Sequence, residues 1–191
     1  MTVKGNVTDS SGNPISDIEI KTVSTTYRLG IDLTDTNGDF DFVSVASNRT
    51  EFDIWVNAKS WSDSQFYQED YGSILYHFKN RDLGNSFILD TIQLHPKATL
   101  NIEVSSSATD TISFVLKYKS PELHYFVNTD DYISPYNYSS QNLLPGMPDY
   151  SKSNSTLQGT EATLTYRINS GEEQEIIIPI NQPTTTYVLS Y

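Results

Sequence analysis

Three histidines are the side chains best suited to acid–base or metal chemistry in this 191-residue sequence, which contains no cysteine. His77, His95 and His124 are widely separated, and we expect a loop, a linker and an insertion to carry them as isolated surface residues. Histidines that share a metal usually recur at short spacings such as i, i+4, and these do not. The lack of cysteine excludes disulfides, thiol catalysis and zinc–thiolate sites within these residues.

Paired carboxylates are the second candidate for chemistry. Asp130-Asp131 and Glu69-Asp70 could flank a sugar as an acid and a base, but any acidic β protein offers such pairs. The sequence contains no nucleophile elbow, no phosphate-binding glycine loop and no zincin motif. We therefore predict a protein that is not an enzyme and has no catalytic residue and no cofactor.

A calcium loop is suggested by the spacing of Asp35, Asn37 and Asp39. The EF-hand pattern requires glycine where Phe40 stands and a distal glutamate where Ala46 stands. A turn explains the three polar residues without a ligand, so the sequence predicts no metal site.

Aromatic residues give the remaining signal for binding. Tryptophan and tyrosine can stack on the apolar faces of sugar rings, while neighbouring Asp, Asn and Gln bond the hydroxyls. The alternative is that these rings simply pack over the ends and edges of the domains. The candidate ligand-binding residues are Trp55, Trp61, Tyr67 and Tyr71 in the first half, and Tyr132, Tyr136 and Tyr138 in a second loop.

Alternating apolar residues describe the elements that would position these side chains. Val3, Gly5 and Val7 alternate with polar residues, which is the period of a half-buried strand. Similar sets follow up to Leu94, and Asn37-Gly38 is a strong hairpin signal. Ser60 to Ser86 interrupts the series, and within it we expect a lid or binding loop with a short helix or turn at residues 71–79.

The pattern restarts after His95-Pro96-Lys97, where proline cannot join a strand ladder. We predict an all-β fold of two small antiparallel β-sandwich domains in tandem, residues 1–95 and 96–191. Strong β patterns begin at Leu100 and end at Tyr191. Residues at about 119–159 are rich in tyrosine and proline, and they predict an ordered, irregular insertion in the second domain.

The first half resembles the carboxypeptidase regulatory-like domain, a transthyretin-like β-sandwich. The matching residues are turn and core positions: Gly5, Val7, Asp9, Gly12, Pro14, Ile15, Thr34, Asp35, Gly38, Phe40 and Phe42. The resemblance implies a spacer or presentation module of the kind found in surface lipoproteins of Bacteroidetes-type bacteria. It implies no peptidase activity, and the second half resembles no family that we identify.

The composition of the chain limits the classes of partner that it could bind. A net charge of −12 and a pI near 4.4 argue against nucleic acid, because binding phosphates requires a basic surface. No apolar run is long enough to span a bilayer, so we expect membrane attachment only through a lipid anchor absent from these residues. Abundant Tyr, Ser, Thr and Asn suggest a secreted or cell-surface protein at an outer membrane, whose signal peptide and lipidated cysteine would lie upstream.

Three functional hypotheses follow. The first is a non-catalytic, secreted or lipid-anchored bacterial surface protein that acts as a scaffold or binding module for a surface protein partner. The second is a glycan-binding protein of a polysaccharide-uptake system that uses the aromatic loops. The third is an adhesin or stalk subunit that assembles by strand addition through Val3–Thr8 or Thr185–Tyr191.

Overall fold

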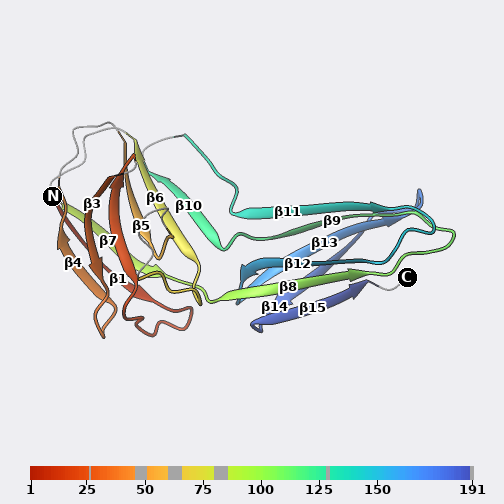
Figure 1. Cartoon of the computed structure of the whole chain (residues 1–191), viewed down its shortest axis with the longest axis horizontal. Coiled ribbons are helices and arrows are strands. Elements are labelled where there is room, and N and C mark those ends of the chain that lie inside the picture. Colours follow the sequence, from red (N-terminus) through yellow and green to blue (C-terminus); the bar gives the residue numbers. More distant parts are fainter. Residues whose placement is uncertain (26, 46–50, 60–65, 80–85, 128–129, 190–191) are drawn as a thin grey trace. The chain divides into compact units, whose positions relative to one another are not determined.

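The computed structural model describes all residues except 26, 46–50, 60–65, 80–85, 128–129 and 190–191. Every regular element in the described part of the chain is a strand, and the strands form four sheets (Figure 1). The residues divide into two compact units. Unit 1 contains Met1–Pro96 and Glu122–Ser134, and unit 2 contains Lys97–Pro121 and Pro135–Tyr191. The prediction of an all-β fold built of sandwiches is confirmed.

Unit 1 is built from a three-stranded and a five-stranded sheet. In spatial order, the smaller sheet contains β4 (Asp39–Val43), β1 (Thr2–Thr8) and β7 (Ser86–Gln93). The larger sheet contains β10 (Glu122–Val127), β6 (Ser73–Lys79), β5 (Glu51–Val56), β2 (Glu19–Ser24) and β3 (Tyr27–Leu33). Most neighbours are antiparallel, but β1 pairs in parallel with β7, and β6 in parallel with β10.

The core of unit 1 follows the alternation in the sequence. Val3 and Val7 on β1 and Ile20 on β2 are fully buried, as are Ile54 and Val56 on β5. Apolar side chains at every second position thus give each sheet an inward face whose burial stabilises the fold.

Close packing explains why two positions in unit 1 require glycine. A Cβ atom on Gly5 would lie 2.6 Å from the ring of Phe40, so β1 and β4 can pair closely only if this position lacks a side chain. Gly38 has a φ of +78°, and a Cβ atom there would lie 2.3 Å from the carbonyl oxygen of Val7. Both glycines therefore allow the turn before β4 to rest on β1.

Unit 2 also contains two sheets. The larger has the order β11 (Tyr136–Leu143), β9 (Ile112–Lys119), β13 (Thr160–Ile168) and β14 (Gln174–Ile180). The smaller has the order β12 (Tyr150–Leu157), β8 (Lys97–Val104) and β15 (Thr184–Leu189). One core cluster draws on both sheets, with Leu100 and Ile102 from β8 and Leu116 and Leu164 from the larger sheet.

The predicted irregular insertion at residues 119–159 is wrong. The segment holds β10, β11 and β12, and its part Glu122–Ser134 belongs to unit 1 rather than to the second domain. The strands escaped the pattern analysis because several inward positions carry small polar side chains. Ser139, Asn154 and Thr156 are all buried where a strand normally shows an apolar residue.

Two further expectations need correction. Residues 71–79 form neither a helix nor a turn, since Ser73–Lys79 is strand β6 between β5 and β10. Val3–Thr8 is no free edge for strand addition, because β1 lies between β4 and β7. By contrast, Thr184–Leu189 is an edge strand, and among the described strands it pairs with β8 alone. No described helix is long and apolar enough to cross a membrane.

Candidate functional site

The outer face of the five-stranded sheet of unit 1 brings together four titratable side chains from three strands. Asp53 lies on β5, His77 on β6, and both Glu122 and His124 on β10. Asp53 is directly opposite His77 in the antiparallel pairing of β5 and β6. His124 is opposite Leu75 in the parallel pairing, so it lies one side-chain step from His77 on the same face.

These four side chains form a continuous hydrogen-bonded line, here called the histidine–carboxylate network. His77 Nδ1 lies 3.0 Å from Asp53 Oδ1, and His77 Nε2 lies 2.8 Å from His124 Nδ1. His124 Nε2 lies 3.1 Å from Glu122 Oε1. The imidazole planes differ by only 7°, with centroids 5.1 Å apart, which suits an in-plane hydrogen bond between ring nitrogens.

The network is partly shielded from water. The side chains of His77 and His124 are 20% and 19% exposed, and that of Asp53 is 27% exposed. The ring of Phe126 stacks on His77 at a centroid distance of 4.7 Å. The arrangement can hold or pass a proton between two carboxylates.

The inner face of the same strand pair is aromatic. Tyr125 of β10 stacks on Tyr76 of β6, with centroids 5.5 Å apart. Burial raises the pKa of Tyr76 to about 12, and the neighbouring Tyr125 adds to the effect. Strand β10 is thus fixed to β6 by apolar contact on one face and by the histidine–carboxylate network on the other.

A buried ion pair lies further along the outer face. Lys21 Nζ donates hydrogen bonds to Glu19 Oε1 at 2.6 Å and to the Ala58 carbonyl oxygen at 2.8 Å. The two charged side chains are only 4% and 3% exposed. Lys21 Nζ also lies 5.4 Å from the centroid of the Trp55 ring, which adds a cation–π contact. These contacts compensate the loss of hydration of both charges.

Asn57 organises the segment that follows β5. Its amide nitrogen donates to the carbonyl oxygens of Gln68, Tyr71 and Gly72, and its amide oxygen accepts from the backbone N–H of Gln68. The residue is fully buried with a φ of +50°. Asn57 therefore has a structural role as the anchor of this loop.

The aromatic residues predicted to bind a ligand are divided between the two units. Trp55, Tyr67 and Tyr71 belong to unit 1 and are half-buried, whereas Trp61 lies outside the described residues. Tyr132 also belongs to unit 1 and is 76% exposed. Their role in binding a polysaccharide stays a prediction.

The predicted second loop is divided between the units. Tyr136 and Tyr138 lie on β11 of unit 2, which pairs along its whole length with β9, whereas Tyr132 belongs to unit 1. Lys117 and Lys119 place their amino groups 4.3 and 5.1 Å from the centroid of Tyr136. That ring is therefore already occupied by cation–π contacts, while Tyr138 remains exposed.

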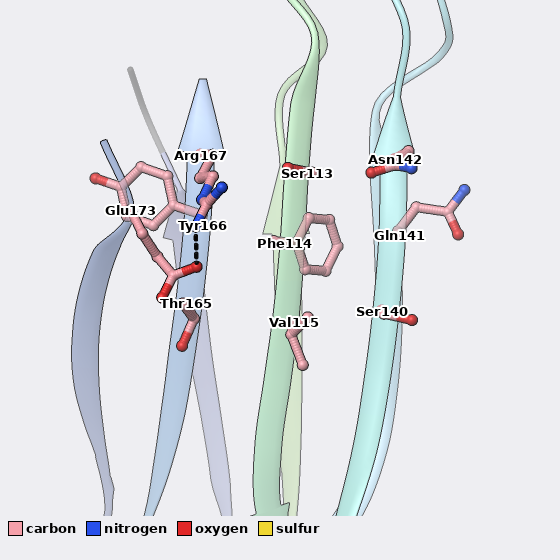
Figure 2. A pocket seen from close by; sticks show the side chains of 10 residues that line it. All are labelled: Ser113, Phe114, Val115, Ser140, Gln141, Asn142, Thr165, Tyr166, Arg167 and Glu173. Carbon is pink, nitrogen blue, oxygen red and sulfur yellow. Dashed lines mark hydrogen bonds and ion pairs between the residues drawn. The ribbon is translucent and has the colours of Figure 1, made fainter. Parts of the chain in front are cut away.

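Unit 2 carries a groove of about 450 Å³ lined from β9, β11 and β13 (Figure 2). Its lining is mainly hydroxyl and amide groups, such as Ser113, Asn142 and Thr165. Arg167 closes one side by pairing with Glu173 at 3.0 Å (Figure 2). Both of these side chains are more than half exposed, so the groove lacks the convergent buried polar groups of a defined ligand site.

The expectation that the histidines are isolated is wrong for two of the three. His77 lies on a strand rather than in a loop, and it contacts His124 directly. The sequence signal is the likeness of Leu-Tyr-His-Phe in β6 to Leu-His-Tyr-Phe in β10, both rich in residues that favour strands. Within the described residues, no group of three or more His, Cys, Asp or Glu side chains is arranged to hold a metal ion.

Comparison with known proteins gives no family. No protein-family model matches the chain, and no curated protein matches it. Similar solved structures include the Bacillus anthracis TIE protein, with 10% identity and a TM-score of 0.36 over 98% of this chain and 33% of that chain. A Streptococcal ancillary pilin has 10% identity and a TM-score of 0.32, over 98% of this chain and 61% of that chain.

A mutant major pilin from Streptococcus pyogenes has 8% identity and a TM-score of 0.23, over 99% of both chains. The present chain thus spans about a third of the length of the first of these structures and about three fifths of the second. Scores this low identify no shared activity or partner.

Proposed function

We propose that this chain is a non-catalytic, load-bearing segment of an extracellular surface protein, which acts as a spacer or stalk between other parts. The observation that carries the proposal is the same in both units. In unit 1, the first strand β1 pairs in parallel with the last consecutive strand β7, and in unit 2 the first strand β8 pairs in parallel with the last strand β15.

Parallel pairing determines how each unit would carry a force. Thr2 lies beside Ser86, and Thr8 lies beside Gln93, so β1 begins at one end of the pair and β7 finishes at the other. A pull on these two ends slides the strands past each other and loads all the hydrogen bonds between them together. In an antiparallel pair of terminal strands, the same pull would separate the bonds one at a time.

Both entry strands are also central rather than at an edge. β1 has β4 as a second neighbour, and β8 has β12. Val3 and Val7 on β1, and Leu100 and Ile102 on β8, are at most 1% exposed. A strand anchored on two sides and by its buried side chains is well placed to transmit tension into the core.

Composition supports an extracellular location, with no cysteine, few charged residues and 13 tyrosines.

The turn after β1 supports the resemblance of unit 1 to the carboxypeptidase regulatory-like domain. The Asp9 carboxylate accepts backbone N–H groups from Ser11 and Asn13, and Gly12 has a φ of +83°. Membership of that family, and attachment through a lipid anchor, are parts of the proposal.

Pulling on unit 2 by single-molecule force spectroscopy tests the proposal. Because the chain lacks cysteine, introduced cysteines give unique handles. Handles at Thr99→Cys and Val188→Cys lie at opposite ends of the β8–β15 pair, near the start of β8 and the end of β15, whereas Thr99→Cys and Thr184→Cys lie side by side. The proposal expects a several-fold higher unfolding force for the first pair. Equal forces would contradict it.

A second candidate function, assembly by strand addition, is favoured by the free edge of β15. An exposed edge strand can pair with a strand of another molecule. Lysine substitution at the exposed Thr186 should then abolish dimers or polymers seen by sedimentation, and the same change at Ser170, an exposed turn residue outside β15, serves as a control. A chain that is monomeric at all concentrations would exclude self-assembly through this edge.

A further inference from the structure

The three links of the histidine–carboxylate network require a definite number of protons. An ionised carboxylate can only accept hydrogen bonds, so Asp53 and Glu122 each need an N–H from the imidazole beside them. The contact between His77 Nε2 and His124 Nδ1 needs one hydrogen between two nitrogens. Three N–H groups on two rings correspond to one neutral imidazole and one imidazolium, whichever ring carries the charge.

Any other number of protons breaks a link. With both rings charged, N–H faces N–H across the 2.8 Å contact, and two cations repel each other. With both rings neutral, only two N–H groups serve three links. Either one carboxylate then faces a bare nitrogen, or His77 Nε2 and His124 Nδ1 face each other without a hydrogen. The network is therefore complete only in the singly charged state.

The charged groups around the network favour that state. Asp53 approaches from β5 and Glu122 from β10, so two carboxylates flank the rings. On β2, which pairs with β5, Val23 lies opposite Asp53, and the ion pair of Lys21 and Glu19 adds no net charge. Phe126, on the same strand as His124, stacks on His77 and carries no charge.

From this geometry we propose that protonation of the histidine–carboxylate network controls the docking of strand β10 on unit 1. Glu122–Ser134 is joined at both ends to residues of unit 2, and the N–H of Ser120 bonds the Pro135 carbonyl at the base of this excursion. β10 is an edge strand with β6 as its single neighbour in the sheet. Loss of the link between the histidines therefore weakens the one strand pairing that holds β10 among the described residues.

Histidine is the side chain that most readily changes its charge near neutral pH, which makes its protonation a suitable control for docking. Docking is strongest at an intermediate pH. It weakens on acidification, when the second imidazole gains a proton and the nitrogen–nitrogen hydrogen bond is lost. It weakens less on the alkaline side, where repulsion between the rings is absent.

The proposal is tested by amide hydrogen exchange on the whole chain between pH 5 and 8. The exchange rates are corrected for the intrinsic effect of pH, and a chelator is added so that stray metal ions do not bind the histidines. Protection of β10 amides should fall about tenfold or more toward pH 5, relative to β1 and β4 of the same unit. The variant His124→Gln should remove this dependence. His95→Gln removes an imidazole outside the network and should leave the dependence unchanged. A flat profile in the wild type, or the same profile in His124→Gln, would overturn the proposal.

Imidazole ¹⁵N resonances of the wild type give a readout that needs no variant. At intermediate pH, three of the four ring nitrogens of His77 and His124 should show attached hydrogens. Two neutral rings throughout the range in which β10 is docked would contradict the proton count.

Discussion

Lys21 and Glu19 form an ion pair two residues apart on β2, with an Nζ–Oε1 distance of 2.6 Å and almost no contact with solvent. Glu19, Lys21 and Val23 lie on the opposite face of the strand from Ile20 and Thr22, yet all five are buried. Strand β2 is thus buried on both faces. At the Lys21–Glu19 pair, the outer face of the sheet is shielded from water.

Breaking this pair from one side should strongly destabilise unit 1. Lys21→Met leaves the Glu19 carboxylate buried without its partner, so we expect a loss of about 3–5 kcal/mol in the free energy of unfolding. Combining it with Glu19→Gln should recover part of the loss. Urea denaturation followed by tryptophan fluorescence reports unit 1, because both tryptophans belong to the first 96 residues.

The matched control is the exposed pair of Lys4 and Asp41, which has nearly the same 2.7 Å distance and side chains 50% and 59% exposed. Lys4→Met should cost no more than about 1 kcal/mol. Similar losses for the two lysine variants would show that burial of the Lys21–Glu19 pair has no energetic consequence.

Glycine substitutions should separate backbone strain from crowding. Gly12 and Gly38 have φ values of +83° and +78°, so alanine is similarly strained at both. An alanine Cβ meets open space at Gly12 but lies 2.3 Å from the Val7 carbonyl oxygen at Gly38.

We expect Gly12→Ala to cost about 1–2 kcal/mol, which is the ordinary penalty for a left-handed conformation. Gly38→Ala should cost at least about 1 kcal/mol more, because β4 must move away from β1. Thermal or urea denaturation provides the comparison, and equal losses would argue against the close approach of the two strands.

Asp110 should make unit 2 sensitive to acid. Hydrogen bonds from the side chains of Asn169, Ser107 and Thr109 lower the pKa of Asp110 below its ordinary 3.8. A carboxyl group with a lowered pKa in the folded state contributes stability that is present above 3.8. That contribution is lost as the pH falls toward the folded-state value.

The variant Asp110→Asn should therefore be less stable than the wild type at pH 7 but nearly equal to it at pH 2. Urea midpoints from circular dichroism at both pH values test this. Asp149→Asn is a suitable control, because Asp149 accepts one backbone hydrogen bond from Ser106. A constant difference between wild type and Asp110→Asn at both pH values would contradict the assignment.

The strands of unit 1 could be predicted where one face is apolar and the other polar. Val3 and Val7, or Phe52, Ile54 and Val56, are buried on one face as their alternation indicates. The same reasoning missed β11 and β12, where the buried positions include Ser139 and Asn154. Hydrogen bonds hold such side chains in place, as from Asn154 Nδ2 to the Leu100 carbonyl oxygen, although Asn154 Oδ1 is buried without a partner. The sequence pattern does not show which polar residues find one.

The contact of His77 with His124 lay beyond sequence reasoning for a different reason. The two residues are 47 positions apart, and a parallel pairing between β6 and β10 brings them together. Local propensity predicts that both segments favour strands, but it carries no information on which distant strand is the neighbour.

The most direct test of the load-bearing function compares two ways of pulling on the same strand pair of unit 1. An N-terminal handle combined with Gln93→Cys pulls from opposite ends of β1 and β7, whereas the same handle with Ser86→Cys pulls from adjacent ends. Both positions are exposed on β7. The parallel pairing predicts a several-fold higher unfolding force for the Gln93 handle. Equal forces, or a lower force for that handle, would contradict the proposed function.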